Sequence, residues 1–159
     1  MLQRGDKMSG SEDFAEVAKL ESEIFSEPWS EESFKKAATC PENLYLIVRI
    51  DNKLCAYCGF WGIAGEGQIT NVAVHPDYRR HGIARKMLEE LLRQGIERGL
   101  NAFTLEVRVG NLGALRLYHS LGFQDAGIRR QFYSHPKEDA MILWLIKDKE
   151  TDNTSHWKY

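Results

Sequence analysis

One short segment of the chain, VAVHPDYRRHGIARK, combines features that suit the binding of a phosphorylated ligand. An apolar run ends at Val74, two adjacent arginines follow at Arg79 and Arg80, and Gly82 stands where a helix is predicted to begin. A helix N-terminus presents free backbone N–H groups and the positive end of the helix dipole to an anion. Because glycine has no Cβ, a phosphate can approach the main chain there. The segment therefore predicts a pyrophosphate-binding loop, and a plain turn with solvated arginines is the alternative.

Two side chains further along the chain could transfer protons. Glu106 lies between Leu105 and Val107 in a predicted strand, so its carboxylate faces the side opposite to these apolar residues. Tyr118 lies in a predicted helix, and a phenol can donate a proton where a carboxylate accepts one. The alternatives are a solvated strand face for Glu106 and a core position for Tyr118.

Several other chemistries lack their motifs. Neither G-x-x-x-x-G-K-[ST] nor G-x-G-x-x-G occurs, which argues against a P-loop and a dinucleotide fingerprint. Cys55 and Cys58 form one C-x-x-C pair, but no second pair completes a zinc site, and the five histidines show no ligand spacing. Positions three apart in a strand face opposite sides, so both cysteines are expected in buried packing, and no metal is predicted.

Apolar periodicity and turn residues define the elements that must position these side chains. Helices are predicted over residues 11–25, 30–38, 82–98 and 111–121. Strands are predicted over residues 2–8, 44–50, 54–63, 68–74, 101–107, 123–128 and 140–146. Glu21 interrupts the apolar face of the first helix, and a loop is expected between residues 128 and 140. The order β-α-α-β-β-β-α-β-α-β-β predicts a mixed α/β layered domain.

Length and charge narrow the class of protein. The 159 residues suffice for one domain, and 21 basic against 23 acidic residues give a formal net charge of −2. This balance argues against direct nucleic-acid binding, which usually shows as a basic surplus. No apolar run approaches the roughly 18 residues that span a bilayer, so no membrane partner is expected. The N-terminus lacks a signal-peptide core, so a cytoplasmic location is expected.

The phosphate loop also carries a family resemblance. The residues RRHGIA at 79–84 resemble the R/Q-x-x-G-x-G/A signature of the GCN5-related N-acetyltransferases (GNAT), and NLGALRLYHSLGF at 111–123 strengthens the likeness. The resemblance covers residues 1–147 as one domain and leaves 148–159 as a polar tail. It implies a central, mostly antiparallel sheet with helices on both faces, and acetyl-CoA as co-substrate without a metal.

Three further patterns resemble one branch of this family, the ribosomal-protein-alanine N-acetyltransferases. They are EPWSE at 27–31, TLEVR at 104–108, and RRQFY at 129–133 followed by EDA at 138–140. The likeness implies that the partner is the N-terminus of a small-subunit ribosomal protein, whose alanine amine attacks the thioester directly in a ternary complex. The oligomeric state does not follow from the sequence.

The resemblance also implies roles for individual residues. Glu106 is implied to be the general base and Tyr118 the general acid. The residues implied to bind acetyl-CoA lie on a strand, the loop after it and two helices: Val72, Ala73, Val74, Arg79, Arg80, His81, Gly82, Ile83, Ala84, Arg85, Asn111 and Tyr118. The residues implied to bind the peptide are Trp29, Tyr133, Glu138 and Asp139.

Each of these roles has a simpler alternative. Asn111 suits a helix N-cap, and both of its roles can hold together. Trp29 could be a core anchor, and Glu138 and Asp139 could form a solvated turn. For the whole chain, two alternatives stay open: an acetyltransferase of a small-molecule amine on the same fold, and a non-catalytic acyl-CoA binding module.

Overall fold

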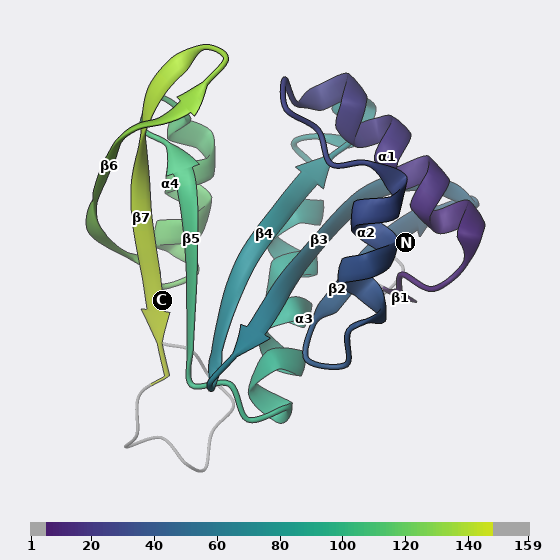
Figure 1. Ribbon diagram of the computed structural model, residues 1–159, viewed down its shortest axis with the longest axis horizontal. Helices are drawn as coiled ribbons and strands as arrows, with labels where there is room; N and C mark the ends of the chain where they lie inside the picture. The colour runs from purple at the N-terminus through teal and green to yellow at the C-terminus, as the bar shows by residue number, and fades with distance from the viewer. Residues whose placement is uncertain (1–5, 148–159) are drawn as a thin grey trace.

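The computed structural model describes residues 6–147, which form one seven-stranded sheet with helices on both faces (Figure 1). The helices are α1 (Ser11–Ile24), α2 (Glu31–Thr39), α3 (Ile83–Glu97) and α4 (Leu112–Ser120), and η1 (Pro76–Tyr78) is a short 3₁₀ turn. The strands are β1 (Asp6–Lys7), β2 (Leu44–Ile50), β3 (Lys53–Ile63), β4 (Glu66–Val74), β5 (Ala102–Arg108), β6 (Gln124–Ser134) and β7 (Lys137–Ile146). The predicted element order is confirmed. The predicted polar tail at 148–159, and the first residues of the predicted strand at 2–8, lie outside the described residues.

The strands lie in the order β1-β2-β3-β4-β5-β7-β6. The neighbours β4 and β5 run parallel, and the other neighbouring pairs run antiparallel. The expected mixed, mostly antiparallel sheet is therefore confirmed. The crossover from β4 to β5 passes through α3, as a parallel pair requires.

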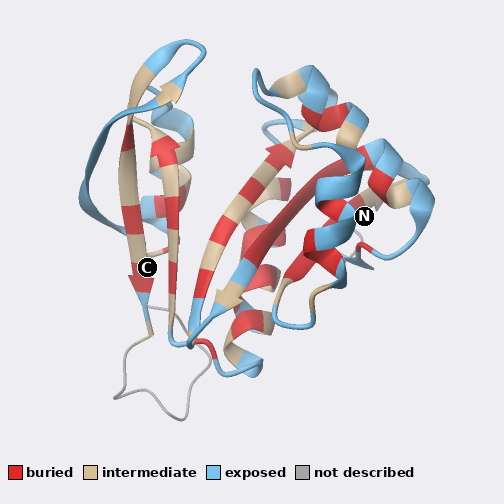
Figure 2. Cartoon of the chain, viewed as in Figure 1, coloured by how far each residue is buried: buried red, intermediate tan, exposed pale blue. Residues whose placement is uncertain are grey.

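Two apolar cores lie on opposite faces of the sheet (Figure 2). The larger core packs α3 and α4 against β2 to β5 and β7, and the smaller core packs α1 and α2 against β2 to β4. Within the described residues, the smaller core takes nothing from β5, β6 or β7. β5 and β7 therefore have one face covered by the larger core and one face left without a helix.

The helices follow the predicted patterns closely. In α3 the buried residues form one stripe: Ile83, Met87, Leu88, Leu91 and Leu92. Ser30 caps α2, because its Oγ accepts a hydrogen bond from Ser33 N at 3.1 Å. Cys55 and Cys58 are buried free thiols, as predicted, and burial raises the pKa of the Cys58 thiol.

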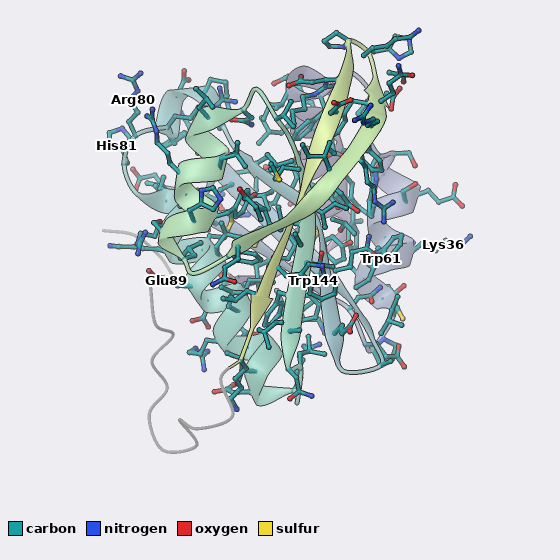
Figure 3. All side chains as sticks on the ribbon, turned by 90° about the vertical axis from the view of Figure 1, so that its left-hand side faces the viewer. Lys36, Trp61, Arg80, His81, Glu89 and Trp144 are labelled. Atoms are coloured by element: carbon teal, nitrogen blue, oxygen red, sulfur yellow. The ribbon has the colours of Figure 1, made fainter. Side chains whose placement is uncertain are left out.

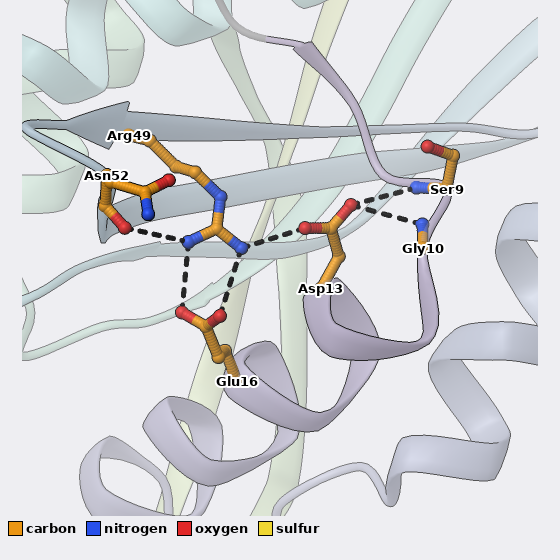
Figure 4. A network of polar contacts seen from close by, with 6 residues as sticks. All are labelled: Ser9, Gly10, Asp13, Glu16, Arg49 and Asn52. Carbon is orange, nitrogen blue, oxygen red and sulfur yellow. Dashed lines mark hydrogen bonds and ion pairs between the residues drawn. The ribbon is translucent and has the colours of Figure 1, made fainter.

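An arginine fixes α1 to β2 through a network of polar contacts (Figure 4). Arg49 Nη2 lies 2.8 Å from Asp13 Oδ1, and Nη1 lies 3.0 Å from Glu16 Oε2. Asp13 Oδ2 also accepts from Ser9 N and Gly10 N, which stand at the start of α1. The network ties the beginning of the helix to the sheet that it covers.

The predicted loop after residue 128 is wrong, because most of it is strand. β6 continues to Ser134, β7 begins at Lys137, and Tyr133 pairs with Glu138. β6 is an edge strand whose residues are nearly all exposed, so it lacks the apolar alternation that marks a half-buried strand. A bulge interrupts the pairing between Arg129 and Tyr133, and there Gln131 has a φ of 52° and its N–H donates to Asp139 Oδ1 at 2.8 Å.

Candidate active site

The centre of the sheet contains a place where two strands part. β4 and β5 pair over Glu66–Gln68 and Ala102–Thr104, and beyond these residues they diverge (Figure 1). The second half of β4 therefore has no strand partner on its β5 side. Backbone groups on that edge are available to an extended ligand lying along the strand.

The register shows which residues of β4 face this edge. His75 N donates to Cys55 O at 2.7 Å, and hydrogen-bonded pairs alternate along an antiparallel ladder. The backbone groups of Ala73 therefore point to β3, whereas those of Val72 and Val74 point to the open edge. Val74 O accepts from Arg79 Nε at 3.1 Å, which leaves the Val74 N–H facing that edge.

The loop after η1 leads into α3 with two left-handed residues. Arg80 has a φ of 67° and Gly82 a φ of 74°, and a Cβ built on Gly82 would meet nothing within 4 Å. Gly82 offers no side-chain cap, so the first-turn N–H groups of Ile83, Ala84 and Arg85 lack an intrahelical acceptor. The predicted helix start at Gly82 is confirmed, and binding of an anion there stays a prediction.

The basic side chains around this loop differ in whether they are exposed or held by contacts with other residues. Arg80 and His81 are exposed and extend outward from the loop (Figure 3). Arg85 instead donates to Ser120 Oγ on α4 and pairs with Glu89 at 3.2 Å. The loop thus presents backbone N–H groups and the exposed side chains of Arg80 and His81, while Arg85 joins α3 to α4.

Glu106 and Tyr118 lie on opposite faces of β5. Leu105 and Val107 belong to the α3/α4 core, and the Glu106 side chain faces the other way, where it is 16% exposed. Tyr118 is in that same core, 6% exposed, with its ring centroid 5.7 Å from that of Phe123. The predicted orientation of Glu106 is confirmed, and both groups adjoin the strand that parts from β4.

Burial of Tyr118 favours the protonated form of its phenol. Burial raises the pKa of Tyr118, because the charged phenolate would lose its hydration. Its hydroxyl makes no hydrogen bond within residues 6–147. About two helix turns earlier, Asn111 Oδ1 accepts from Ala114 N at 3.2 Å, which confirms Asn111 as the N-cap of α4.

Of the candidate peptide-binding residues, the structure gathers Tyr133 and Glu138 around Arg108, which sequence reasoning did not single out. The Arg108 guanidinium lies 4.2 Å from the centroid of the Tyr133 ring. Glu138 lies 3.3 Å from Arg108 Nη1, and its other oxygen accepts from Gly110 N at 2.7 Å. Asp139 instead binds the β6 bulge. Both carboxylates thus already have partners within the chain.

Trp29 sits at the edge of the smaller core. Its ring centroid is 5.3 Å from that of Phe34 and 5.9 Å from that of Trp61, and Trp29 is half-buried. Trp61 is exposed at the surface. The anchor role is therefore present, while part of the Trp29 side chain stays accessible.

The buried carboxylate of Glu21 was also missed as a site residue. Glu21 accepts from Trp29 N at 2.7 Å, from Tyr57 Oη at 3.1 Å and from Asn71 Nδ2 at 3.2 Å. Asn71 Oδ1 is buried without a partner among the described residues. The signal was in the sequence, because Glu21 interrupts an otherwise apolar helix face.

The connection between α1 and α2 reaches across to the β6–β7 hairpin. Ser26 Oγ donates to His135 O at 2.6 Å, and Glu27 Oε1 lies 3.0 Å from His135 Nδ1. A hydrogen bond from Ser134 and the neighbouring His135 lower the pKa of Glu27. These contacts join the α1–α2 connection to the β6–β7 hairpin on the side of the sheet that Glu106 faces.

Two other kinds of site were sought in residues 6–147. No three His, Cys, Asp or Glu side chains in this range are grouped so as to hold a metal ion. No helix in the same range has the length and apolarity of a membrane span.

Comparison with known proteins adds relatives to this geometry. Residues 14–123 match the sequence model of the "Acetyltransferase (GNAT) family". The chain is 37% identical over 130 residues to the Escherichia coli K12 "[Ribosomal protein bS18]-alanine N-acetyltransferase", covering 79% of this chain and 86% of that protein. It is 35% identical over 137 residues to the Mycobacterium tuberculosis "N-alpha-acetyltransferase RimI", covering 82% and 85%.

A solved structure agrees with these relatives. The crystal structure of the E. coli ribosomal-protein-S18-alanine N-acetyltransferase superposes with a TM-score of 0.84 at 31% identity, covering 98% of this chain and 100% of that one. Ard1 from Thermoplasma volcanium, at 20% identity and a TM-score of 0.81, shares the fold.

Proposed function

Because this chain belongs to the GNAT family of acetyltransferases, we propose that it acetylates the N-terminal alanine of ribosomal protein bS18, using acetyl-CoA. One observation carries the proposal: Glu106 and Tyr118 lie on opposite faces of β5, beside the point where β4 and β5 part. A base on one face and an acid on the other suit a transfer in which the amine arrives from one side and the leaving group departs on the other.

The residues present fit acetyl-CoA. The free N–H groups at the start of α3, with open space at Gly82, suit its pyrophosphate. The unpaired edge of β4 at Val72 and Val74 suits its amide-containing arm, which can hydrogen-bond like an added strand. When bound, acetyl-CoA supplies the acetyl group as an activated thioester.

Ala73 contributes differently from its two neighbours. Its backbone groups are engaged with β3, so it holds the strand in register while Val72 and Val74 face the ligand. The Val74 N–H also suits a developing negative charge on the carbonyl oxygen, in the manner of an oxyanion hole. Around the loop, Arg79, Arg80 and His81 shape the approach to the phosphates.

Glu106 acts as the general base. A peptide α-amine has a pKa of about 7.7–8.0, so a modest share of it is already neutral near pH 7, unlike a lysine amine at about 10.4. The Glu106 carboxylate, directly or through one water, takes the extra proton of the ammonium form, and the neutral amine then attacks the thioester carbon. The residues Tyr133, Glu138, Asp139 and Trp29 line the approach for the peptide, with Arg108 holding Tyr133 and Glu138 in place.

Tyr118 acts as the general acid. Its buried phenol keeps its proton because burial raises the pKa of Tyr118, and it donates that proton to the departing sulfur. The hydroxyl makes no hydrogen bond within residues 6–147, so it is available for this role. Asn111, as the N-cap, fixes the start of the helix that carries Tyr118.

The test is acetyl transfer by the full chain to a peptide that copies the N-terminus of bS18 and begins with alanine. The acetylated product is identified by mass spectrometry, and the same peptide with a blocked N-terminus is the control. Glu106→Gln is expected to lower kcat about a hundredfold, while the exposed Glu97→Gln leaves it unchanged. Transfer to spermidine without transfer to the peptide would contradict the proposed substrate.

A further inference from the structure

The Glu106 carboxylate makes a single ion pair among the residues that the structure describes, with the guanidinium of Arg129. Arg129 Nε lies 3.7 Å from Glu106 Oε1, which is too long for a good N–H···O hydrogen bond. The Glu106 side chain is 16% exposed, whereas that of Arg129 is 57% exposed. A largely buried carboxylate is therefore neutralised by a counter-ion that sits mostly in water and is loosely held.

Arg108, a second arginine on the same face, is held much more firmly than Arg129. Arg108 Nη1 donates to Pro136 O at 3.0 Å, Nη2 donates to His135 O at 3.2 Å, and the guanidinium also pairs with Glu138. It lies over the Tyr133 ring as well. Arg108 is thus fixed from four directions, and displacing it would break several hydrogen bonds.

Arg129 has a second favourable contact besides its ion pair with Glu106. Its guanidinium carbon is 5.8 Å from the centroid of the Phe132 ring, at the exposed bulge of β6. A cation gains some attraction over an aromatic face, so the side chain can leave Glu106 without losing all favourable contacts. The two arginines therefore differ: Arg108 is held in place by several contacts, whereas a bound ligand could displace Arg129 from Glu106.

We propose that Arg129 is a positioning residue that reserves the amine position: it pairs with Glu106 in the free protein and is displaced by the cationic α-amine of the acceptor. The inference rests on the proposed function, because it takes Glu106 as the group that receives the amine. Most α-amine is protonated near pH 7, so it arrives as a cation. An ammonium can form a short, charge-assisted hydrogen bond to the carboxylate, which Arg129 does not.

The exchange predicts a split between KM and kcat. Removing the competing cation in Arg129→Gln should lower the KM for the peptide about two- to fivefold, the range expected for an exposed ion pair. The kcat should stay within about twofold, because Arg129 has already left when the reaction occurs. Arg129→Lys, which keeps the charge, should restore the wild-type KM, and Arg129→Ala repeats the test if the glutamine variant folds poorly.

A matched control and a coupling test sharpen the result. Arg130→Gln removes the next arginine, which is exposed and makes no ion pair within residues 6–147, so it corrects for the general loss of positive charge. Peptide affinity with CoA bound is then measured by calorimetry for Glu106→Gln with and without Arg129→Gln. The gain in peptide affinity caused by Arg129→Gln should vanish in the Glu106→Gln background, because no carboxylate remains there for which Arg129 and the amine compete.

The outcomes separate this inference from the proposed function. An unchanged or raised KM in Arg129→Gln, an equal decrease in Arg130→Gln, or tightening that persists without Glu106 overturns the exchange. The proposed function stands in those cases as long as the wild type acetylates the alanine peptide. If the wild type acetylates no alanine peptide, the proposed function and the exchange both fail.

Discussion

Replacing Tyr118 by phenylalanine separates the chemistry of the site from its packing. The hydroxyl makes no hydrogen bond within the described chain, and the ring stays in the α3/α4 core against Phe123. The free energy of unfolding should therefore change by no more than about 0.5 kcal/mol. The loss of a proton donor should lower kcat by about 10²–10³, which corresponds to about 3–4 kcal/mol of transition-state stabilisation.

The matched control is Tyr45→Phe, which deletes a buried hydroxyl in the other core. Tyr45 Oη lies 2.6 Å from Thr70 Oγ1, and burial raises the pKa of Tyr45 to about 12. This variant should lose about 1 kcal/mol of stability and keep its kcat, the reverse of the Tyr118 result. Urea denaturation and chromatography of the acetylated peptide measure the two quantities.

The pH dependence gives a second check on Tyr118. Since burial raises the pKa of Tyr118, the phenol remains the proton-donating form up to and beyond pH 10, the ordinary value for tyrosine. The wild-type kcat should therefore show no alkaline loss below pH 10 that depends on Tyr118. A kcat decrease of less than threefold in Tyr118→Phe, or a stability loss as large as that of Tyr45→Phe, would refute the reasoning.

Three further predictions concern the loop, the framework and the buried carboxylate. Gly82→Ala should cost about 1–2 kcal/mol, because Gly82 has a φ of 74°, and it should raise the KM for acetyl-CoA, as urea denaturation and steady-state kinetics can show. Arg49→Met should cost about 1–3 kcal/mol in urea denaturation, because it leaves Asp13 and Glu16 without their partner; a change below 0.5 kcal/mol would contradict the role of this network. Burial raises the pKa of Glu21 above its ordinary 4.5, despite the three donors that it accepts from. The contribution of Glu21 to the free energy of unfolding is therefore complete below pH 4.5, and it is lost as the pH rises through the pKa that Glu21 has in the folded protein. The wild type should gain stability relative to Glu21→Gln as the pH falls from neutral. A stability difference that stays constant across that pH range would argue against this reasoning.

The sequence predicted those features that depend on a few consecutive residues. The helix that starts at Gly82, the Asn111 cap and the orientation of Glu106 all follow from local spacing, and the structure confirms them. Side-chain alternation in a strand and the free N–H groups of a first helical turn are properties of the backbone itself.

The errors and omissions share a different cause. The extent of β6 was missed because an edge strand can be polar throughout, while its hydrogen bonds go to β7, a partner that the local pattern does not identify. The sequence pattern did not distinguish the roles of Arg108 and Arg129. Their difference arises from contacts with residues about 20–30 positions away, as in the Arg108–Glu138 pair and the Arg129–Glu106 pair.

By itself, the sequence determined the elements, the glycine at the start of α3 and the face of β5 that the Glu106 side chain takes. Only the tertiary structure decided that β4 and β5 pair at one end and part at the other, with Glu106 and Tyr118 on opposite sides of the strand beside that opening. The physical reason is that local periodicity fixes which face a side chain takes within its own element. Which elements become neighbours, and where their pairing stops, depends on hydrogen bonds and packing between distant parts of the chain.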